Sequence, residues 1–561
     1  MKNLFRITLF LLSLILLVSC NSTNNNKSSL TGWNFNDPKY GSYIKGTSFK
    51  GQKVPNGMVA IEGGTFTMGQ VQDDIMFDWN TTPQQMHVRS FYLDEAEVTN
   101  SEYLLYLQVT KDIFPPSEEK YKNIYSSALP DTLVWRSSLG NTELLSENYL
   151  RHPAYSDYPV VGVSWLQAVQ YCKWRTSAVN LKNLIDKGVL SNVLGNDTIR
   201  NFFDTDLYLE NPYRLFNGDS TVYKRGLPDN KARKKGEPRP PKGAFTGRQV
   251  TSQDGILSQK FRLPTEVEWE YAAKATSENR EYNNIRGRKK YAWSGKYTRD
   301  NSKRYKGDQL ANFKQRKGSY SGLAGWSEDG SDIPITIKSY PPNAYGLYDM
   351  SGNVAEWVAD VYRPIIDTEA NDFNYFRGNI FTKKLIDASG KVVVIGESAK
   401  AMVKYDTLPN GKIVATELPG EIKYVPVTKD DVFMRRNYNT ASNLDKNDGD
   451  KVSNRLYELD DDQLTNKSRM YNSPINTKDE ASGKLNKYDV KKRPTLISNK
   501  TRVHKGGSWL DREYWLDPAQ RRYLPEYMST NFIGFRCATD VVGVLPFNKK
   551  LLETLRDKNW V

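Results

Sequence analysis

The chain has 561 residues, with 79 Lys and Arg against 65 Asp and Glu, and it contains only three His and three Cys. This scarcity of His and Cys excludes a large zinc or iron–sulfur site. No GxGxxG, Walker A, HExxH or GxSxG pattern occurs, so the common nucleotide-binding, zinc-protease and serine-hydrolase classes lack their motifs.

The first residues predict export. Lys2 and Arg6 flank the start of an apolar run over residues 9–18, which is too short to span a membrane comfortably. A basic start, a short apolar core and a small residue before the cleavage point describe a secretory signal over 1–19. Because Cys20 follows, the segment resembles a bacterial lipoprotein signal, which implies that Cys20 is acylated. An ordinary signal peptide with an incidental Cys is the alternative.

Asn21 stands where an Asp would favour retention at the inner membrane, so we expect an outer-membrane anchor on the periplasmic face. Residues 20–53 are rich in Asn, Ser, Thr, Lys and Gly, which predicts a flexible tether. Removal of Lys2 and Arg6 with the signal lowers the formal net charge from +14 to +12. Since the chain is predicted to be exported, envelope polymers, lipid headgroups or acidic proteins are expected partners rather than nucleic acid.

Two capping patterns predict helix starts, the S-x-x-Q run 164–167 and the T-x-x-E run 265–268. A third helix-like segment begins with the run 99–102. Apolar residues follow each run at helical spacing, so we expect three amphipathic helices packed on a core.

Two long polar stretches, 177–259 and 361–501, read as insertions between these ordered blocks. In the second, strand-like runs at 392–395, 401–405 and 413–415 surround a Pro-Asn-Gly turn at 409–411, which predicts a hairpin.

The tail 546–561 predicts a short helix with leucines on one side, which docks either on its own domain or on a partner. Its leucines are Leu551, Leu552 and Leu555.

The ordered blocks resemble the formylglycine-generating-enzyme, or sulfatase-modifying-factor, family. The resemblance rests on GMVAIEGGTFTMG at 57–69, RLPTEVEWEYA at 262–272 and GLYDMSGNVAEW at 346–357, together with runs at 91–100, 159–165, 506–509 and 534–537. It implies a mixed α+β domain over 54–545, related to C-type lectins, poor in regular secondary structure and carrying the two insertions.

The same resemblance implies that the chain is not an enzyme. The family's reactive cysteines lie three and eight residues past the Ser of the Gly-Gly-Ser motif, where this chain has Asp511 and Leu516. Copper(I) selects soft thiolate ligands, so we expect no copper and no oxidation of a cysteine peptide. Cys172 and Cys537 match family positions that form a structural disulfide.

Two calcium sites recur in the family, and calcium prefers carboxylate and carbonyl oxygens. The resemblance places the first at Asn312, Phe313, Asp329 and Ser331, and the second at Asp349, Gly352, Val354 and Glu356. The alternative for Asp349 and Glu356 is that they cap turns and pair with Arg.

A lipoprotein signal combined with two insertions resembles gliding-motility lipoproteins of the Bacteroidota. It implies a non-catalytic scaffold beside the gliding and type IX secretion machinery, with envelope proteins as partners, among them a ring-forming lipoprotein of the same fold. A glycan- or peptidoglycan-binding module is the alternative, and a copper oxidase that generates formylglycine is a third.

Overall fold

The computed structural model describes the chain in segments, which are residues 28, 30–33, 52–70, 80–136, 142–191, 203–218, 222–223, 249–275, 289–315, 333–363, 376–397, 403–428, 431 and 500–543. The chain divides into a smaller unit (1–50, 182–195 and 219–257) and a larger unit that holds the remaining residues. The smaller unit thus takes two of its pieces from the predicted insertion 177–259. Its described part includes a β-bridge between Leu190 and Tyr223. The predicted signal, tether and tail lie largely or wholly outside the described residues.

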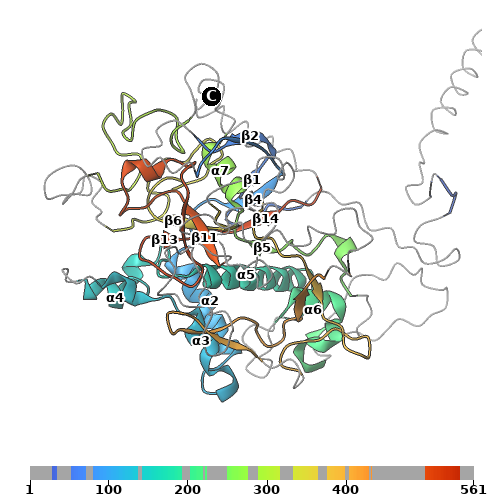
Figure 1. The fold of residues 1–561 in the computed structure, drawn as a ribbon. Coiled ribbons are helices and arrows are strands. Elements are labelled where there is room, and N and C mark those ends of the chain that lie inside the picture. The colour runs from blue at the N-terminus through green and yellow to red at the C-terminus, as the bar shows by residue number, and fades with distance from the viewer. Residues whose placement is uncertain are drawn as a thin grey trace, which may run out of the picture. The chain divides into compact units, whose positions relative to one another are not determined.

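The larger unit contains two four-stranded sheets (Figure 1). The first is antiparallel and has the order β1 (Met58–Ile61), β4 (Phe91–Asp94), β14 (Ala538–Asp540) and β5 (Phe261–Arg262). The second has the order β12 (Arg522–Pro525), β11 (Thr501–Lys505), β6 (Ala355–Val361) and β13 (Ile533–Gly534). Every residue of β6 is buried, as expected for a central strand covered on both faces.

Three two-stranded sheets complete the β structure of the described residues. They pair β2 (Gly64–Met68) with β3 (Gln84–Val88), β7 (Thr382–Lys384) with β10 (Tyr424–Pro426), and β8 (Tyr405–Thr407) with β9 (Ile413–Ala415). The last two sheets belong to the predicted insertion 361–501.

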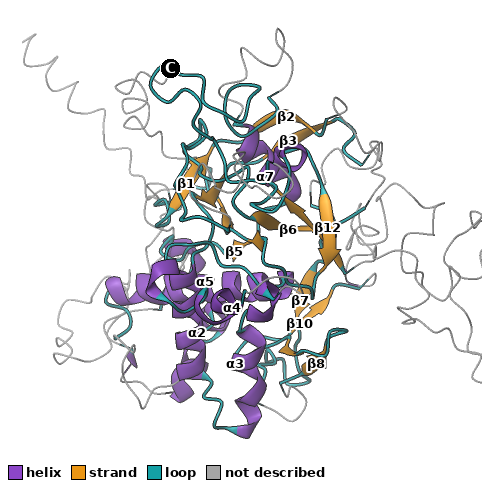
Figure 2. Ribbon diagram, turned by 90° about the vertical axis from the view of Figure 1, so that its left-hand side faces the viewer, coloured by secondary structure: helices purple, strands orange, loops and turns teal. Residues whose placement is uncertain are grey.

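The helices of the described residues are α2 (Asn100–Ile113), α3 (Lys122–Ala128), α4 (Glu143–Asn148), α5 (Trp165–Asp186), α6 (Thr205–Glu210) and α7 (Glu266–Lys274). None of them is long and apolar enough to cross a membrane. Figures 1 and 2 place α2, α3 and the residues of α5 up to 181 on one side of the two large sheets, and α7 on the other.

All three predicted helix starts are confirmed. Thr99 and Thr265 each cap a helix in a capping box, with Glu102 and Glu268 as the reciprocal acceptors. The helix that begins at Trp165 follows Ser164, whose backbone N–H donates to the Gln167 side chain at 2.9 Å. These patterns predict well because a capping box depends only on residues within one turn.

The predicted hairpin of the insertion is partly wrong. Its turn is correct, because Gly411 adopts φ +81° between β8 and β9. However, Val392 and Val394 form isolated bridges with Ile386 and Ile422 instead of a strand beside the hairpin. The choice of partner strand depends on contacts distant in sequence, which the local pattern does not contain.

The core is rich in aromatic side chains. Tyr103, Tyr171 and Phe535 are buried together, and the rings of Tyr103 and Tyr171 stack with centroids 5.6 Å apart. Burying Tyr requires a partner for its hydroxyl group, and Tyr103 donates to the Ala128 carbonyl at 2.8 Å. The expected mixed α+β domain with little regular structure is confirmed in its helix and strand content.

Candidate functional site

The Gly-Gly-Ser motif forms a tight loop directly after β11. Gly507 has φ +68°, and a Cβ atom there would lie 2.7 Å from the Trp515 carbonyl oxygen. The position therefore requires glycine. The loop leads into a short 3₁₀ helix, Glu513–Leu516, so position 511 lies just before this helix and position 516 is its last residue.

The carboxylate of Asp511 is fully engaged by its neighbours. Its two oxygens accept a bidentate pair of hydrogen bonds from Arg522, both at 2.6 Å, and Oδ2 also accepts from the Ser508 hydroxyl at 2.5 Å. The Arg522 guanidinium lies over the ring of Trp515, 4.8 Å from its centroid. Bidentate Arg–carboxylate pairs are strong and geometrically specific. Asp511 is therefore a structural anion in this loop.

Leu516 is completely buried and packs in a cluster with Tyr291, Ala311 and Phe313. The side chain has no atom that could ligate a metal or react as a nucleophile. Its backbone carbonyl accepts a hydrogen bond from the Ser351 hydroxyl at 2.8 Å, which ties the loop to the segment before β6.

His504 lies on β11, next to this loop, and is 3% exposed. Burial, with a further contribution from the Arg522 charge, holds the pKa of His504 well below its usual value. Its Nδ1 atom is buried without a partner. A neutral imidazole packed against Trp357 and Phe532 is a core residue rather than a general acid.

The residues predicted for the second calcium site are brought together before and within β6. Asp349 adopts φ +56° and accepts the backbone N–H of Lys338 at 2.8 Å through Oδ2, while its Oδ1 is buried without a partner. Glu356 binds Arg536 through both oxygens, at 2.6 and 2.7 Å, and also accepts from the Trp269 indole at 2.8 Å. The alternative interpretation, pairing with Arg, thus describes Glu356, whereas Asp349 keeps a free acceptor.

Glu97 is a residue of this site that the sequence reasoning missed. It is buried, and its Oε1 accepts from the Asn353 amide at 3.2 Å, while Oε2 has no partner. Burial, reinforced by the charges of Asp349 and Glu356, raises the pKa of Glu97 well above its usual value. The signal was present in the run DEAEVTN at 94–100, where Glu97 precedes the first helix.

Two carboxylate groups of this site have the electrostatic properties expected of ligands to a cation. Burial also raises the pKa of Asp349 to about 6, with the neighbouring Glu356 adding to the effect. Two partnerless carboxylate oxygens in one buried region are costly unless they are protonated or meet a positive charge. Nevertheless, within the described segments no group of three or more His, Cys, Asp or Glu side chains is arranged to hold a metal ion.

The first predicted calcium site is only half described. Asp329 and Ser331 lie outside the described residues. The Asn312 amide donates to the Ile333 carbonyl at 2.9 Å, and the Asn312 carbonyl accepts the Asn353 N–H at 2.9 Å. Phe313 is buried beside Leu516. The described half of this set therefore stabilises the loop around β6 through backbone contacts.

Cys172 on α5 and Cys537 before β14 lie with their Sγ atoms 3.3 Å apart, and both are buried free thiols in this structure. The structure thus brings the predicted pair into contact without a disulfide bond, and the bond itself stays a prediction. Burial and the neighbouring Cys172 raise the pKa of Cys537 well above its usual value, so its thiol stays protonated. Cys20 lies outside the described residues.

Comparison with known proteins identifies the family of the chain. The sulfatase-modifying factor enzyme 1-like domain matches residues 46–401, which is more than half of the chain. The chain is 23% identical to the formylglycine-generating enzyme of Bos taurus over 322 residues, covering 54% of this chain and 58% of that enzyme. It therefore spans a little over half the length of this curated relative.

An inactive relative is similar over a shorter stretch. The chain is 35% identical to the inactive C-alpha-formylglycine-generating enzyme 2 of Mus musculus over 107 residues, which are 18% of this chain and 27% of that protein. Among solved structures, PvdO of Pseudomonas aeruginosa is matched over 89% of this chain and 100% of its own, at 16% identity and a TM-score of 0.34. The chain belongs to the sulfatase-modifying factor enzyme 1-like domain family.

Proposed function

We propose that this chain is a non-catalytic member of its family. The observation that carries the proposal is the state of positions 511 and 516, where a salt-bridged carboxylate and a buried leucine stand at the positions that the family resemblance assigns to the reactive cysteines. Activation of oxygen by copper(I) in this family requires two thiolates close together. The two described cysteines, Cys172 and Cys537, lie elsewhere, on α5 and before β14.

Oxygen consumption tests this proposal directly. Purified chain loaded with copper and supplied with a cysteine-containing peptide is expected to consume no oxygen above a protein-free control. The Asp511→Ala variant is the matched comparison, because it removes the carboxylate that stands at the first cysteine position. Copper-dependent turnover that disappears in Asp511→Ala would show an enzyme and refute the proposal.

Calcium at the second site is part of the proposal. The buried, partnerless Oδ1 of Asp349 supports it, because calcium favours carboxylate oxygens among its ligands. Glu356 would contribute least to calcium binding, since both of its oxygens already bind Arg536. The relation of the fold to C-type lectins stays a prediction from the family resemblance.

The biological role we propose is a scaffold, anchored in the outer membrane through Cys20 on the periplasmic face, in the gliding-motility and type IX secretion machinery. The described part of the second insertion supports a contact role, because Ile380, Phe381 and Ile386 are 42%, 53% and 59% exposed. Three exposed large apolar side chains in this insertion offer apolar surface to a partner.

Co-purification tests the scaffold. The tagged mature protein, extracted gently from the outer membrane, is expected to retain other envelope proteins near one-to-one, including a lipoprotein of the same fold. A Phe381→Ser/Ile386→Ser variant should lose these proteins while keeping its melting temperature. Recovery of the tagged protein alone in both cases would count against the scaffold.

Glycan binding is the second candidate. It is favoured by Tyr297 and Tyr305, which are 71% and 51% exposed in the segment 289–315 and offer aromatic faces on which sugar rings can stack. Saturable binding of purified wall fragments that is lost in Tyr297→Ala would favour this module, and no binding would remove it.

A further inference from the structure

A cavity of about 180 Å³ lies between the helices of the family domain and the second insertion. Its walls come from α2, α3, α5 and the segment 414–418, and all of them belong to the larger unit. A second, small cavity of about 10 Å³ shares Tyr106, Thr110, Gln170, Lys173 and Leu418 with it. The smaller space has room for about one water molecule, so the larger one is the binding volume of interest.

The insertion is attached firmly to the helices around this cavity. The Tyr405 hydroxyl donates to the Lys120 carbonyl at 2.7 Å, and the Lys412 ammonium donates to the Leu129 carbonyl at 2.7 Å. Ala415 packs in an apolar cluster with Phe114 and Ile124. The wall formed by β9 is thus a fixed part of the larger unit, and the cavity exists because the insertion folds back on α3.

The lining is largely apolar. Ile124, Ala128, Leu166, Val169 and Val414 contribute to it. An engineered apolar cavity of about 150 Å³ stays dry and binds benzene, a single ring. A volume of about 180 Å³ accommodates a ring with one further small group.

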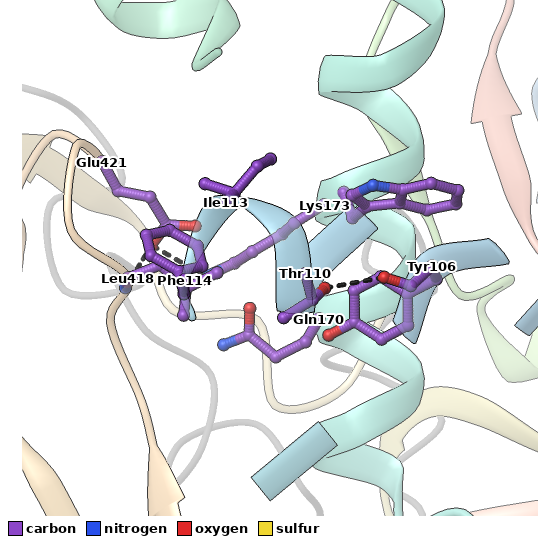
Figure 3. A pocket seen from close by; sticks show the side chains of 9 residues that line it. Tyr106, Thr110, Ile113, Phe114, Gln170, Lys173, Leu418 and Glu421 are labelled. Atoms are coloured by element: carbon purple, nitrogen blue, oxygen red, sulfur yellow. Dashed lines mark hydrogen bonds and ion pairs between the residues drawn. The ribbon is translucent and has the colours of Figure 1, made fainter. Parts of the chain in front are cut away.

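Gln170 supplies an unused hydrogen-bond acceptor at the boundary of the two cavities. Its Nε2 donates to the Thr416 carbonyl at 3.3 Å, but its Oε1 is buried without a partner. Figure 3 shows this side chain extending from α5 into the space lined by Thr110 and Leu418. A buried acceptor without a donor costs free energy, and a ligand that brings a donor removes the cost.

The charges around the cavity favour a neutral ligand. Lys173, whose side chain runs from α5 toward Glu421, lies with Nζ 4.0 Å from the Glu421 carboxylate, so each charge is partly balanced by the other (Figure 3). Burial raises the pKa of Tyr106, so its hydroxyl stays neutral. The remaining lining groups are uncharged.

We infer that this cavity binds a small neutral aromatic compound that carries one hydrogen-bond donor, of the size of phenol or indole, with the donor directed at Gln170 Oε1. The inference does not depend on the proposed scaffold role, because it rests on the cavity, its apolar walls and the unused acceptor.

Titration calorimetry with phenol and with toluene tests it. Both rings should bind the intact mature chain saturably. In Gln170→Met the ratio of phenol to toluene affinities should fall roughly fivefold, because phenol loses its acceptor while toluene loses nothing. The exposed Gln108 on α2 provides the matched control, and Gln108→Met should leave the ratio unchanged. An unchanged ratio in Gln170→Met, or no saturable binding of either ring, would overturn the inference.

A second measurement locates the bound ring without a variant. Addition of indole to methyl-labelled protein should shift the methyl resonances of Ile124, Leu166 and Val169, and shifts confined to other methyl groups would refute the assignment. Ala415→Leu fills the cavity and should abolish binding of both rings. If that variant does not fold, the methyl shifts of the wild-type chain decide the question alone.

Discussion

Neutralising Glu356 should destabilise the chain severely, because Glu356 is the counterion of a buried arginine. Arg536 is 0% exposed and Glu356 is 1% exposed. In Glu356→Gln the amide group must turn a donor toward Arg536 or toward the Trp269 indole, and the guanidinium loses its counter-charge. Removing one partner of a buried ion pair costs about 3–5 kcal/mol. We expect a loss of this size in the free energy of unfolding.

Urea unfolding in excess chelator measures this loss and keeps any contribution of calcium out of the comparison. The control is Glu143→Gln, because Glu143 pairs with Arg136 at 2.9 Å on the surface, with side chains 55% and 57% exposed. Exposed pairs contribute about 0.2–1 kcal/mol, so the control should barely move the midpoint.

A double variant keeps the test decisive if Glu356→Gln does not fold. In Glu356→Met/Arg536→Met neither charge is left buried alone, so stability should partly return relative to the single variant. Equal losses in Glu356→Gln and Glu143→Gln would refute the reasoning, since they would show that Arg536 finds sufficient compensation from the Asp94 and Tyr348 carbonyls.

Three further outcomes are expected. Calcium should raise the melting temperature of the wild-type chain at pH 7, and it should do so less at pH 5. The reason is that burial raises the pKa of Asp349 to about 6, so that its carboxyl group is protonated at pH 5. An equal response to calcium in Asp349→Asn would exclude Asp349 as a ligand. Burial, with Glu266 adding to it, raises the pKa of Asp360 to about 7, so its contribution to stability is full below about pH 4 and is lost as the pH rises to 7. The stability advantage of the wild-type chain over Asp360→Asn, measured by urea midpoints, should therefore shrink across that range. Oxidation should join Cys172 to Cys537 and stabilise the chain by up to about 5 kcal/mol, as peptide mapping and unfolding with and without reductant would show, and two free thiols after oxidation would contradict it.

The sequence predicts those features of the fold that depend on neighbouring residues. The capping boxes at Thr99 and Thr265 identify helix starts correctly, because donor and acceptor lie within one turn. The bridge partners of Val392 and Val394 cannot be predicted in this way, because strand pairing depends on contacts distant along the chain. The cavity beside Gln170 also depends on contacts distant along the chain, because β9 meets α3 only after the insertion has folded back.

The candidate site, too, was predictable from the sequence only in part. The family resemblance points to Asp349 and Glu356, and the structure places both in one buried region. Resemblance alone does not show that Arg536 already occupies the Glu356 carboxylate, nor that Glu97 brings a third buried acid beside them. Those properties arise from burial and from strand pairing, in which Gly534 of β13 lies opposite Glu356 of β6.

The loop between β11 and β12 is stabilised by Asp511 and Leu516 in two different ways. Asp511 is 13% exposed and would be an expensive anion alone, but Arg522, eleven residues later at the start of β12, neutralises it with two hydrogen bonds. Leu516 fills the apolar space between Tyr291 and Phe313. One position thus contributes an ion pair that joins the loop to β12, and the other contributes packing. Both residues have structural roles in the loop, and these roles support the proposal of a non-catalytic chain.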